Sequence, residues 1–153
     1  MAAPRQADPG WTAPRNRCAS WFGATDVAVV GDTVYVLTGE GYDDQLSRAV
    51  FRAVPGGAPQ QVASILKFAQ RIVPLDSLIL SGGLPSNPYA LIAAPDGQTL
   101  YVSDGASGHI FSITLDGRIR IFATLPNMPP ITGLAWGPDG RLYVAMFSSL
   151  PHT

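Results

Sequence analysis

Three segments of the 153-residue chain repeat one pattern, in which a short apolar run, a tight turn and a second apolar run follow each other. The segments are residues 26–36, 90–102 and 133–144. Their turns carry Asp-Gly twice and Gly-Asp once, and these dipeptides tolerate the positive φ that two-residue hairpin turns need. The pattern therefore predicts three β-hairpins.

A second pattern follows the first two hairpins. Residues 50–57 align with residues 110–117 at an offset of 60 residues, and both stretches read as a strand that ends in a glycine turn and leads to a fourth strand. Four short antiparallel strands form one blade of a propeller. Tyr101 and Tyr143 lie 42 residues apart, which fits the roughly 40–45 residues of such a blade.

The first unit carries extra chain, since Tyr35 and Tyr101 are 66 residues apart. Part of it lies between Ser64 and Ser86, where apolar side chains follow helical spacing and Pro74 would end a helix. These side chains are Val62, Ile65, Leu66, Ala69, Ile72 and Val73. We expect one short helix on a rim of the blade.

Composition agrees with an all-β chain of many turns. Gly and Pro number 16 and 14, and charged residues make up 14% of the chain, against about 25% in a typical soluble domain. The formal net charge of -1 gives no reason to expect a nucleic acid or an anionic membrane as partner. The single cysteine, Cys18, excludes an intramolecular disulfide and a cysteine-based zinc site.

Beyond the repeat itself, several motifs resemble the NHL-like, six-bladed β-propeller superfamily, and within it the ScyD/ScyE family. They are the stretch 86–90, the Pro-Asp-Gly of 95–97 with the Leu-Tyr-Val-Ser-Asp of 100–104, the stretch 131–144 and the start 25–29. The resemblance implies an all-β, partial β-propeller of four-stranded antiparallel blades with one short helical insertion.

On this interpretation the chain divides into a flexible lead-in, residues 1–20, and a partial propeller, residues 21–153. The propeller comprises a blade at 21–63, an insertion at 64–86, a blade at 87–125 and the start of the next at 126–153. Six blades need roughly 250 residues. Because an open propeller leaves an apolar blade face in water, we expect a fragment of a longer reading frame or a chain that self-associates.

The sequence offers no catalytic constellation, and no catalytic residue is predicted. His109 and His152 are the only histidines, and His109 is expected to be a partly exposed residue at the start of a strand. Glu40, Asp43 and Asp44 form the one acidic loop cluster, which falls short of the roughly 6–8 oxygen ligands of calcium. Asp104 is expected to cap the turn that follows its strand.

Propeller ligands usually bind at one end of the central channel, on loops that lead into the innermost strands. The resemblance places Asp26, Asn87, Tyr89 and Thr132 there, as candidate binding residues. In lactonase-type relatives Asn and carboxylate side chains at such positions hold a divalent metal. Under that alternative Asp26 and Asn87 would be two of the ligands of an ion such as calcium; otherwise no cofactor is expected.

We therefore expect a ScyD/ScyE-like propeller that binds a small molecule or a protein, and the lack of a catalytic constellation weighs against an enzyme. One alternative is a metal-dependent lactonase or hydrolase, and another is an interaction scaffold that presents Trp136 and Phe147 on open surfaces. The resemblance implies an extracellular or periplasmic protein, although residues 1–17 are polar and contain no signal peptide. Pro and Gly interrupt every long uncharged stretch, so no membrane span is predicted.

Overall fold

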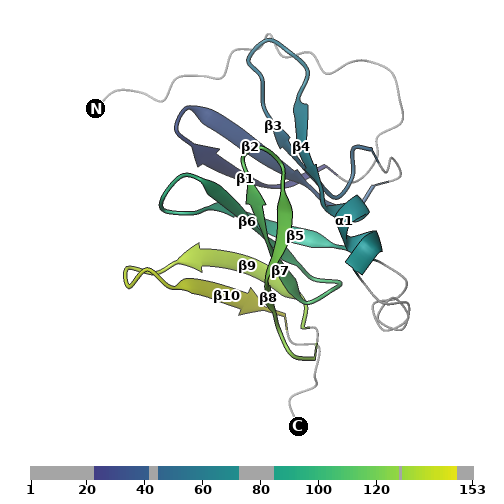
Figure 1. The fold of residues 1–153 in the computed structure, drawn as a ribbon, viewed down its shortest axis with the longest axis vertical. Helices are drawn as coiled ribbons and strands as arrows, with labels where there is room; N and C mark the ends of the chain where they lie inside the picture. Colours follow the sequence, from purple (N-terminus) through teal and green to yellow (C-terminus); the bar gives the residue numbers. More distant parts are fainter. Residues whose placement is uncertain (1–22, 42–44, 73–84, 128, 148–153) are drawn as a thin grey trace.

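The computed structural model describes residues 23–41, 45–72, 85–127 and 129–147, and in these residues it contains ten strands and one helix (Figure 1). The strands are β1 (Ala24–Val30), β2 (Thr33–Thr38), β3 (Ala49–Arg52), β4 (Gln60–Ser64), β5 (Pro88–Ala93), β6 (Thr99–Asp104), β7 (His109–Thr114), β8 (Ile119–Thr124), β9 (Ile131–Trp136) and β10 (Leu142–Met146). The helix, α1, spans Ile65–Ile72. The predicted all-β architecture with one short helix is confirmed.

Each sheet consists of strands that are consecutive in the sequence and antiparallel. Blade 1 has the order β1-β2-β3-β4, blade 2 has β5-β6-β7-β8, and blade 3 is the pair β9 and β10 in the described residues. The first strands of the three sheets lie side by side, with β5 between β1 and β9. In Figure 1 the three sheets follow one another along the long axis, as in a segment of a propeller.

The predicted hairpins all form. The turns between the first two strands of each blade contain Gly31, Gly97 and Gly140, whose φ angles are 56°, 65° and 75°. These left-handed values are strained for residues with a Cβ, so the Gly-Asp and Asp-Gly dipeptides set the hairpin positions.

The core lies between blades 1 and 2. We call the face of a blade that looks toward the preceding blade its leading face, and the opposite face its trailing face. Cross-strand partners share a face. Val27 and its partner Val36 lie on the leading face of blade 1, and Leu91 and its partner Val102 lie on the leading face of blade 2. The buried cluster combines the trailing face of blade 1 with the leading face of blade 2 and one helix residue, namely Ala28, Tyr35, Leu37, Val50, Ala63, Ile65, Leu91, Leu100, Val102, Phe111 and Ile113.

Helix α1 covers one end of this core, as its apolar spacing predicts. Ile65, Leu66 and Ala69 are buried, and Phe68 meets Phe111 of β7 edge to face, with ring centroids 5.6 Å apart. The Ser64 hydroxyl accepts the first-turn N–H of Lys67 and caps the helix. Pro74, the expected terminator, lies outside the described residues. No helix in the described part of the chain is long and apolar enough to cross a membrane.

Blade 3 is attached to blade 2 through Trp136. Its indole N–H donates to the carbonyl oxygen of Ala93 at 2.8 Å, and its ring meets Tyr101 edge to face with centroids 5.6 Å apart. Trp136 is therefore half-buried between blades, and the expectation that it is exposed is wrong. Phe147, which was expected to be exposed with it, is 63% exposed.

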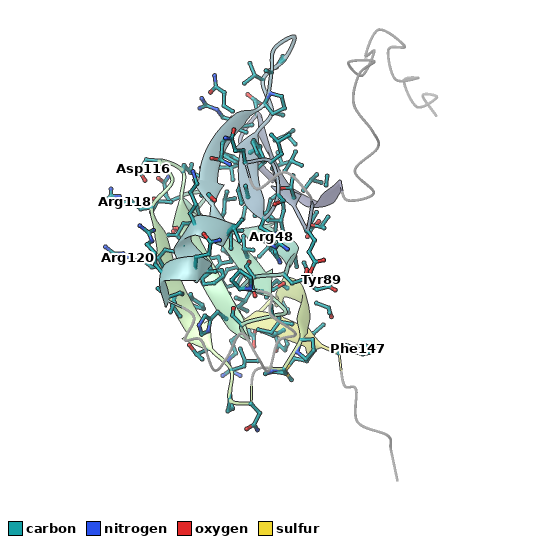
Figure 2. All side chains as sticks on the ribbon, turned by 90° about the vertical axis from the view of Figure 1, so that its right-hand side faces the viewer. Arg48, Tyr89, Asp116, Arg118, Arg120 and Phe147 are labelled. Carbon is teal, nitrogen blue, oxygen red and sulfur yellow. The ribbon has the colours of Figure 1, made fainter. Side chains whose placement is uncertain are left out.

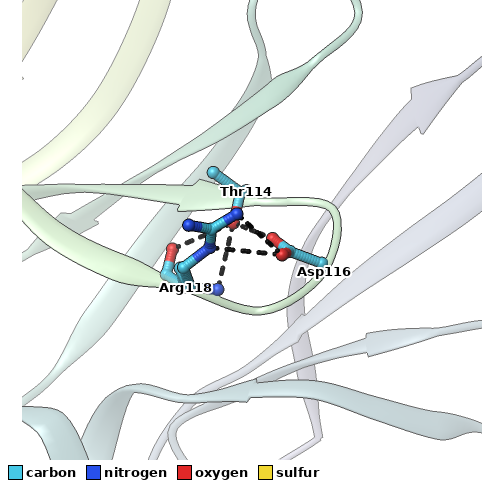
Figure 3. A network of polar contacts seen from close by, with 3 residues as sticks. All are labelled: Thr114, Asp116 and Arg118. Atoms are coloured by element: carbon cyan, nitrogen blue, oxygen red, sulfur yellow. Dashed lines mark hydrogen bonds and ion pairs between the residues drawn. The ribbon is translucent and has the colours of Figure 1, made fainter.

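The outer strands of blades 1 and 2 come close at the turn between β7 and β8 (Figure 3). Thr114, Asp116 and Arg118 form a local polar network there, in which Arg118 pairs with Asp116 at 3.1 Å. Hydrogen bonds from Thr114 and then Arg118 lower the pKa of Asp116. In the same turn a Cβ on Gly117 would lie 2.2 Å from the carbonyl oxygen of Val62 in β4.

Candidate functional site

The three inner strands begin at the same end of the blades, which we call the upper rim. There, one equivalent backbone hydrogen bond closes each pair of first and second strands. The bonds join Gly39 N–H to Gly23 O at 3.4 Å, Gly105 N–H to Asn87 O at 2.8 Å, and Phe147 N–H to Pro130 O at 2.9 Å. Figure 2 shows Tyr89 and Phe147 at this edge, on the side of the molecule opposite Asp116 and Arg118.

Asn87 and Tyr89 are two of the predicted binding residues, and the structure joins them. The Asn87 side-chain amide donates to the Tyr89 hydroxyl at 3.4 Å. The Tyr89 ring packs against the backbone of Gly105, where an added Cβ would lie 3.0 Å from a ring carbon. Although held in this way, Tyr89 remains 43% exposed. The pair thus presents a fixed aromatic ring and polar atoms to solvent.

Below this pair, Asp104 is fully buried and organises the rim. One carboxylate oxygen accepts the N–H groups of Ala106 and Ser107 at 3.1 and 2.9 Å and the Ser107 hydroxyl at 2.9 Å. The other accepts the Ser86 hydroxyl and the Asn87 N–H, the latter at 3.1 Å. The prediction that Asp104 caps the next turn is confirmed. It also fixes the backbone from which Asn87 projects, which the sequence did not indicate.

Arg48 is a rim residue that sequence reasoning missed. It precedes β3, is buried, and donates from Nε to the carbonyl oxygen of Ser86 at 2.9 Å. Its φ of 50° is left-handed, and at the equivalent position of blade 2 stands Gly108, with φ of 65°. A non-glycine residue in this conformation is strained and persists where its surroundings hold it. In the sequence, the alignment of Arg48 with Gly108 is the feature that could have indicated this unusual backbone position.

Asp26, another predicted binding residue, bonds to backbone groups. One of its carboxylate oxygens accepts the N–H of Val27 at 2.8 Å, and the other accepts the N–H of Leu91 at 2.8 Å. Leu91 belongs to β5, so the carboxylate connects the inner strands of blades 1 and 2. Asp26 therefore has a structural role at the blade junction.

Thr132, the fourth predicted residue, is exposed on β9 next to the buried Ile131. It stands at the position of β9 that matches Tyr89 of β5 and Thr25 of β1, and Thr25 is also exposed. The rim therefore repeats an exposed position on three neighbouring strands. No described contact joins Thr132 to Asn87 or Asp26.

A metal centre finds limited support. Among the described residues, no three His, Cys, Asp or Glu side chains are grouped closely enough to hold an ion. Two members of the acidic loop cluster, Asp43 and Asp44, lie outside the described residues, as do His152 and Cys18.

His109 lies at the start of β7, half-buried, as predicted. Its Nδ1 atom is buried and has no hydrogen-bond partner among the residues that the structure describes. Burial lowers the pKa of His109 below its usual 6.5, and the nearby negative charge of Asp104 partly opposes this effect.

No family model matches the chain, and no curated protein is similar to it in sequence. Solved structures do match in fold. Virginiamycin B lyase from Staphylococcus aureus aligns with a TM-score of 0.52 and 18% identity over 81% of this chain. A catalytically inactive variant of the same lyase, solved with quinupristin, aligns with a TM-score of 0.55 and 17% identity over 86% of this chain.

These alignments cover 34% and 37% of the lyase chains, so the present chain spans about a third of the structures that it matches. At such low identity the likeness shows the fold alone. The chain is thus a partial propeller in its architecture.

Proposed function

We propose that this chain is part of a binding propeller of the ScyD/ScyE type, which holds a small molecule at the upper rim over Tyr89 and Asn87. The observation that carries the proposal is the exposed, internally bonded pair that these two side chains form. The motifs described above support the family assignment, and the propeller architecture agrees with it.

The pair favours a ligand with a flat ring and a polar edge. The Tyr89 ring is braced by Gly105, so binding would cost little side-chain entropy. The Asn87 amide has a second N–H and a carbonyl oxygen with which to bond a polar group on the ligand. The rim also carries Thr25 and Thr132, whose hydroxyls would meet a ligand wide enough to span neighbouring blades.

The test is a titration of the ¹⁵N-labelled chain with indole and, separately, with glucose, monitored by amide chemical shifts. We expect saturable shifts at Asn87, Ala90 and Gly105 for at least one probe. The substitution Tyr89→Ala should abolish them. Tyr143→Ala is the matched control, because Tyr143 is a comparably exposed tyrosine on another surface. Shifts scattered over the molecule, or equal loss in both variants, would contradict the proposal.

A second candidate is a propeller enzyme, in line with the lyase name of the two structural neighbours. Quinupristin, with which one of these neighbours was solved, supplies the test. Quinupristin incubated with the chain, with and without a divalent cation, would be analysed by liquid chromatography and mass spectrometry. Conversion that depends on the cation and on Asp26 or Asn87 would favour the enzyme. Recovery of intact quinupristin would leave the binding proposal as the better supported one.

A further inference from the structure

The leading face of blade 1 is apolar and is not covered by the described residues. Val27, Val29 and Val34 are 56%, 59% and 38% exposed on it. Beside them is a groove of about 250 Å³, lined by Val36, Thr38, Leu46, Phe51, Ala53 and Pro59. None of these described lining residues is charged. Such a contiguous apolar surface marks an interaction site.

Blade 2 shows what this face is built to contact. The register of the strands matches Val27, Val34 and Val36 of blade 1 with Leu91, Leu100 and Val102 of blade 2. These blade 2 residues are 4%, 0% and 0% exposed, because the trailing face of blade 1 covers them. The uncovered face of blade 1 therefore has the residue pattern of a face that receives another blade.

The other half of such an interface lies on blade 3. On the trailing face of blade 1, Tyr35 is 5% exposed and packs into the core. Its equivalent on blade 3 is Tyr143, which is 54% exposed. Tyr143 pairs with Ala135 across β9 and β10, just as Tyr35 pairs with Ala28 across β1 and β2. Blade 3 thus repeats the small residue and the tyrosine that blade 1 uses against blade 2.

The hydrogen bonding of the Val27 N–H is also compatible with a contact between the leading face of blade 1 and blade 3. Inside the chain, the Leu91 N–H needs a carboxylate from the preceding blade, and Asp26 supplies it at 2.8 Å. The equivalent donor on blade 1, the Val27 N–H, is already bonded to Asp26 of its own strand. The residue of blade 3 equivalent to Asp26 is Gly133, which has no carboxylate to offer. The leading face of blade 1 can therefore accept blade 3 without leaving the Val27 N–H unpaired.

We propose that the leading face of blade 1 binds the trailing face of blade 3 of a second copy of this chain. The contact joins different surfaces of the two copies, so it closes a ring or extends an open assembly. It repeats between copies the apolar part of the interface that blades 1 and 2 form within one copy, without the bond from Leu91 to Asp26. It goes beyond the proposed function, since it uses neither Tyr89 nor Asn87.

The test measures the mass of the 153-residue chain by sedimentation velocity over a range of concentrations. We expect the wild-type chain to exceed the 16.2 kDa of one copy. Val29→Asp places an unpaired charge on one face and Ala135→Asp on the other, and each should raise the apparent dissociation constant by about 100-fold or more. Each variant alone should then sediment as a single copy.

Mixing the two variants tests the head-to-tail arrangement. Val29→Asp keeps its blade 3 face and Ala135→Asp keeps its blade 1 face, so a mixture should form a 1:1 pair that grows no further. Gln98→Asp, in an exposed turn away from both faces, is the control and should retain the wild-type mass. Far-UV circular dichroism checks that each variant is folded.

A wild-type chain that sediments as a single copy at all concentrations would overturn the proposal, and would leave the face to another segment of the same polypeptide. This result does not depend on the variants. Variants that both keep the wild-type mass, or a mixture that stays monomeric, would also overturn it.

Discussion

The carboxylate of Asp26 accepts the backbone N–H of Leu91, 65 residues away, at 2.8 Å. This bond joins the inner strands of blades 1 and 2 at the point where β1 and β5 both depart from regular register. A charged acceptor on a partly buried amide strengthens such a bond. The side chain that sequence reasoning placed at a ligand site thus holds two blades in position.

Asp26→Ala should lower the free energy of unfolding by about 1.5–3 kcal/mol, since it removes charge-assisted bonds and leaves the Leu91 N–H unpaired. Asp26→Asn should cost less, because the amide oxygen can still accept one N–H. Urea denaturation followed by circular dichroism measures both. Asp96→Ala is the control, since Asp96 accepts only the N–H of Gln98 in an exposed turn. An equal loss in this control would contradict a special role for Asp26.

Asp104→Asn should destabilise the chain by about 2–4 kcal/mol. The substitution turns one acceptor oxygen into a donor that faces the hydroxyl and N–H groups already bonded there, inside a fully buried site. Asp116→Asn, on the exposed turn, should change stability little. Thermal and urea unfolding measure the difference. Comparable values for the two variants would show that the buried network contributes no more than a surface contact.

Trp136→Phe should cost about 1–3 kcal/mol, because the phenyl ring can keep an aromatic contact with Tyr101 but leaves the Ala93 carbonyl without its donor. Tyr143→Phe provides the matched control. It removes only the exposed bond from the Tyr143 hydroxyl to Asp139, and should change stability by less than about 0.5 kcal/mol. Hydrogen exchange at β9 should also quicken in Trp136→Phe alone. Unchanged protection of β9 would argue against Trp136 as the attachment of blade 3.

His109 should make stability depend on pH. Burial lowers its pKa in the folded chain below 6.5, so the unfolded chain binds the proton more readily. Stability from this group is therefore complete above pH 6.5 and is lost as the pH falls from 6.5 through the lower, folded-state pKa. His109→Leu should flatten this part of the stability profile, measured by urea unfolding at several pH values. If the stability of His109→Leu kept the same slope with pH, the pH dependence would belong to another titratable group.

Local features of the sequence predicted most of the fold. The Asp-Gly and Gly-Asp turns, the central tyrosines and the spacing before Pro74 are short-range signals, and they located hairpins and helix because backbone conformation there depends on near neighbours. The capping role of Asp104 was predictable for the same reason, since it bonds residues two and three positions along.

Contacts between blades were beyond that reasoning. The family resemblance placed Asp26 at the channel mouth, and nothing near it in the sequence reveals its bond to Leu91. Trp136 was expected on an open surface, since its partners in blade 2 are brought to it only by the stacking of sheets. Arg48 was missed because its reach to Ser86 spans 38 residues. Of the four candidate binding residues, the structure joins Asn87 and Tyr89, which are two positions apart in the sequence at the start of β5.

The glycine between β7 and β8 controls how closely the outer strands of blades 1 and 2 approach. Gly117 lets the turn lie directly on the backbone of β4, where any larger residue would collide with Val62. The distance between the outer strands of two neighbouring blades, together with the distance between their inner strands, defines the angle between these blades, which we call the wedge. A bulkier residue at this position would open the wedge, and wider wedges complete a circle with fewer blades. The missing side chain of Gly117 therefore helps to set the angle between blades 1 and 2, and this angle decides how many blades complete a circle.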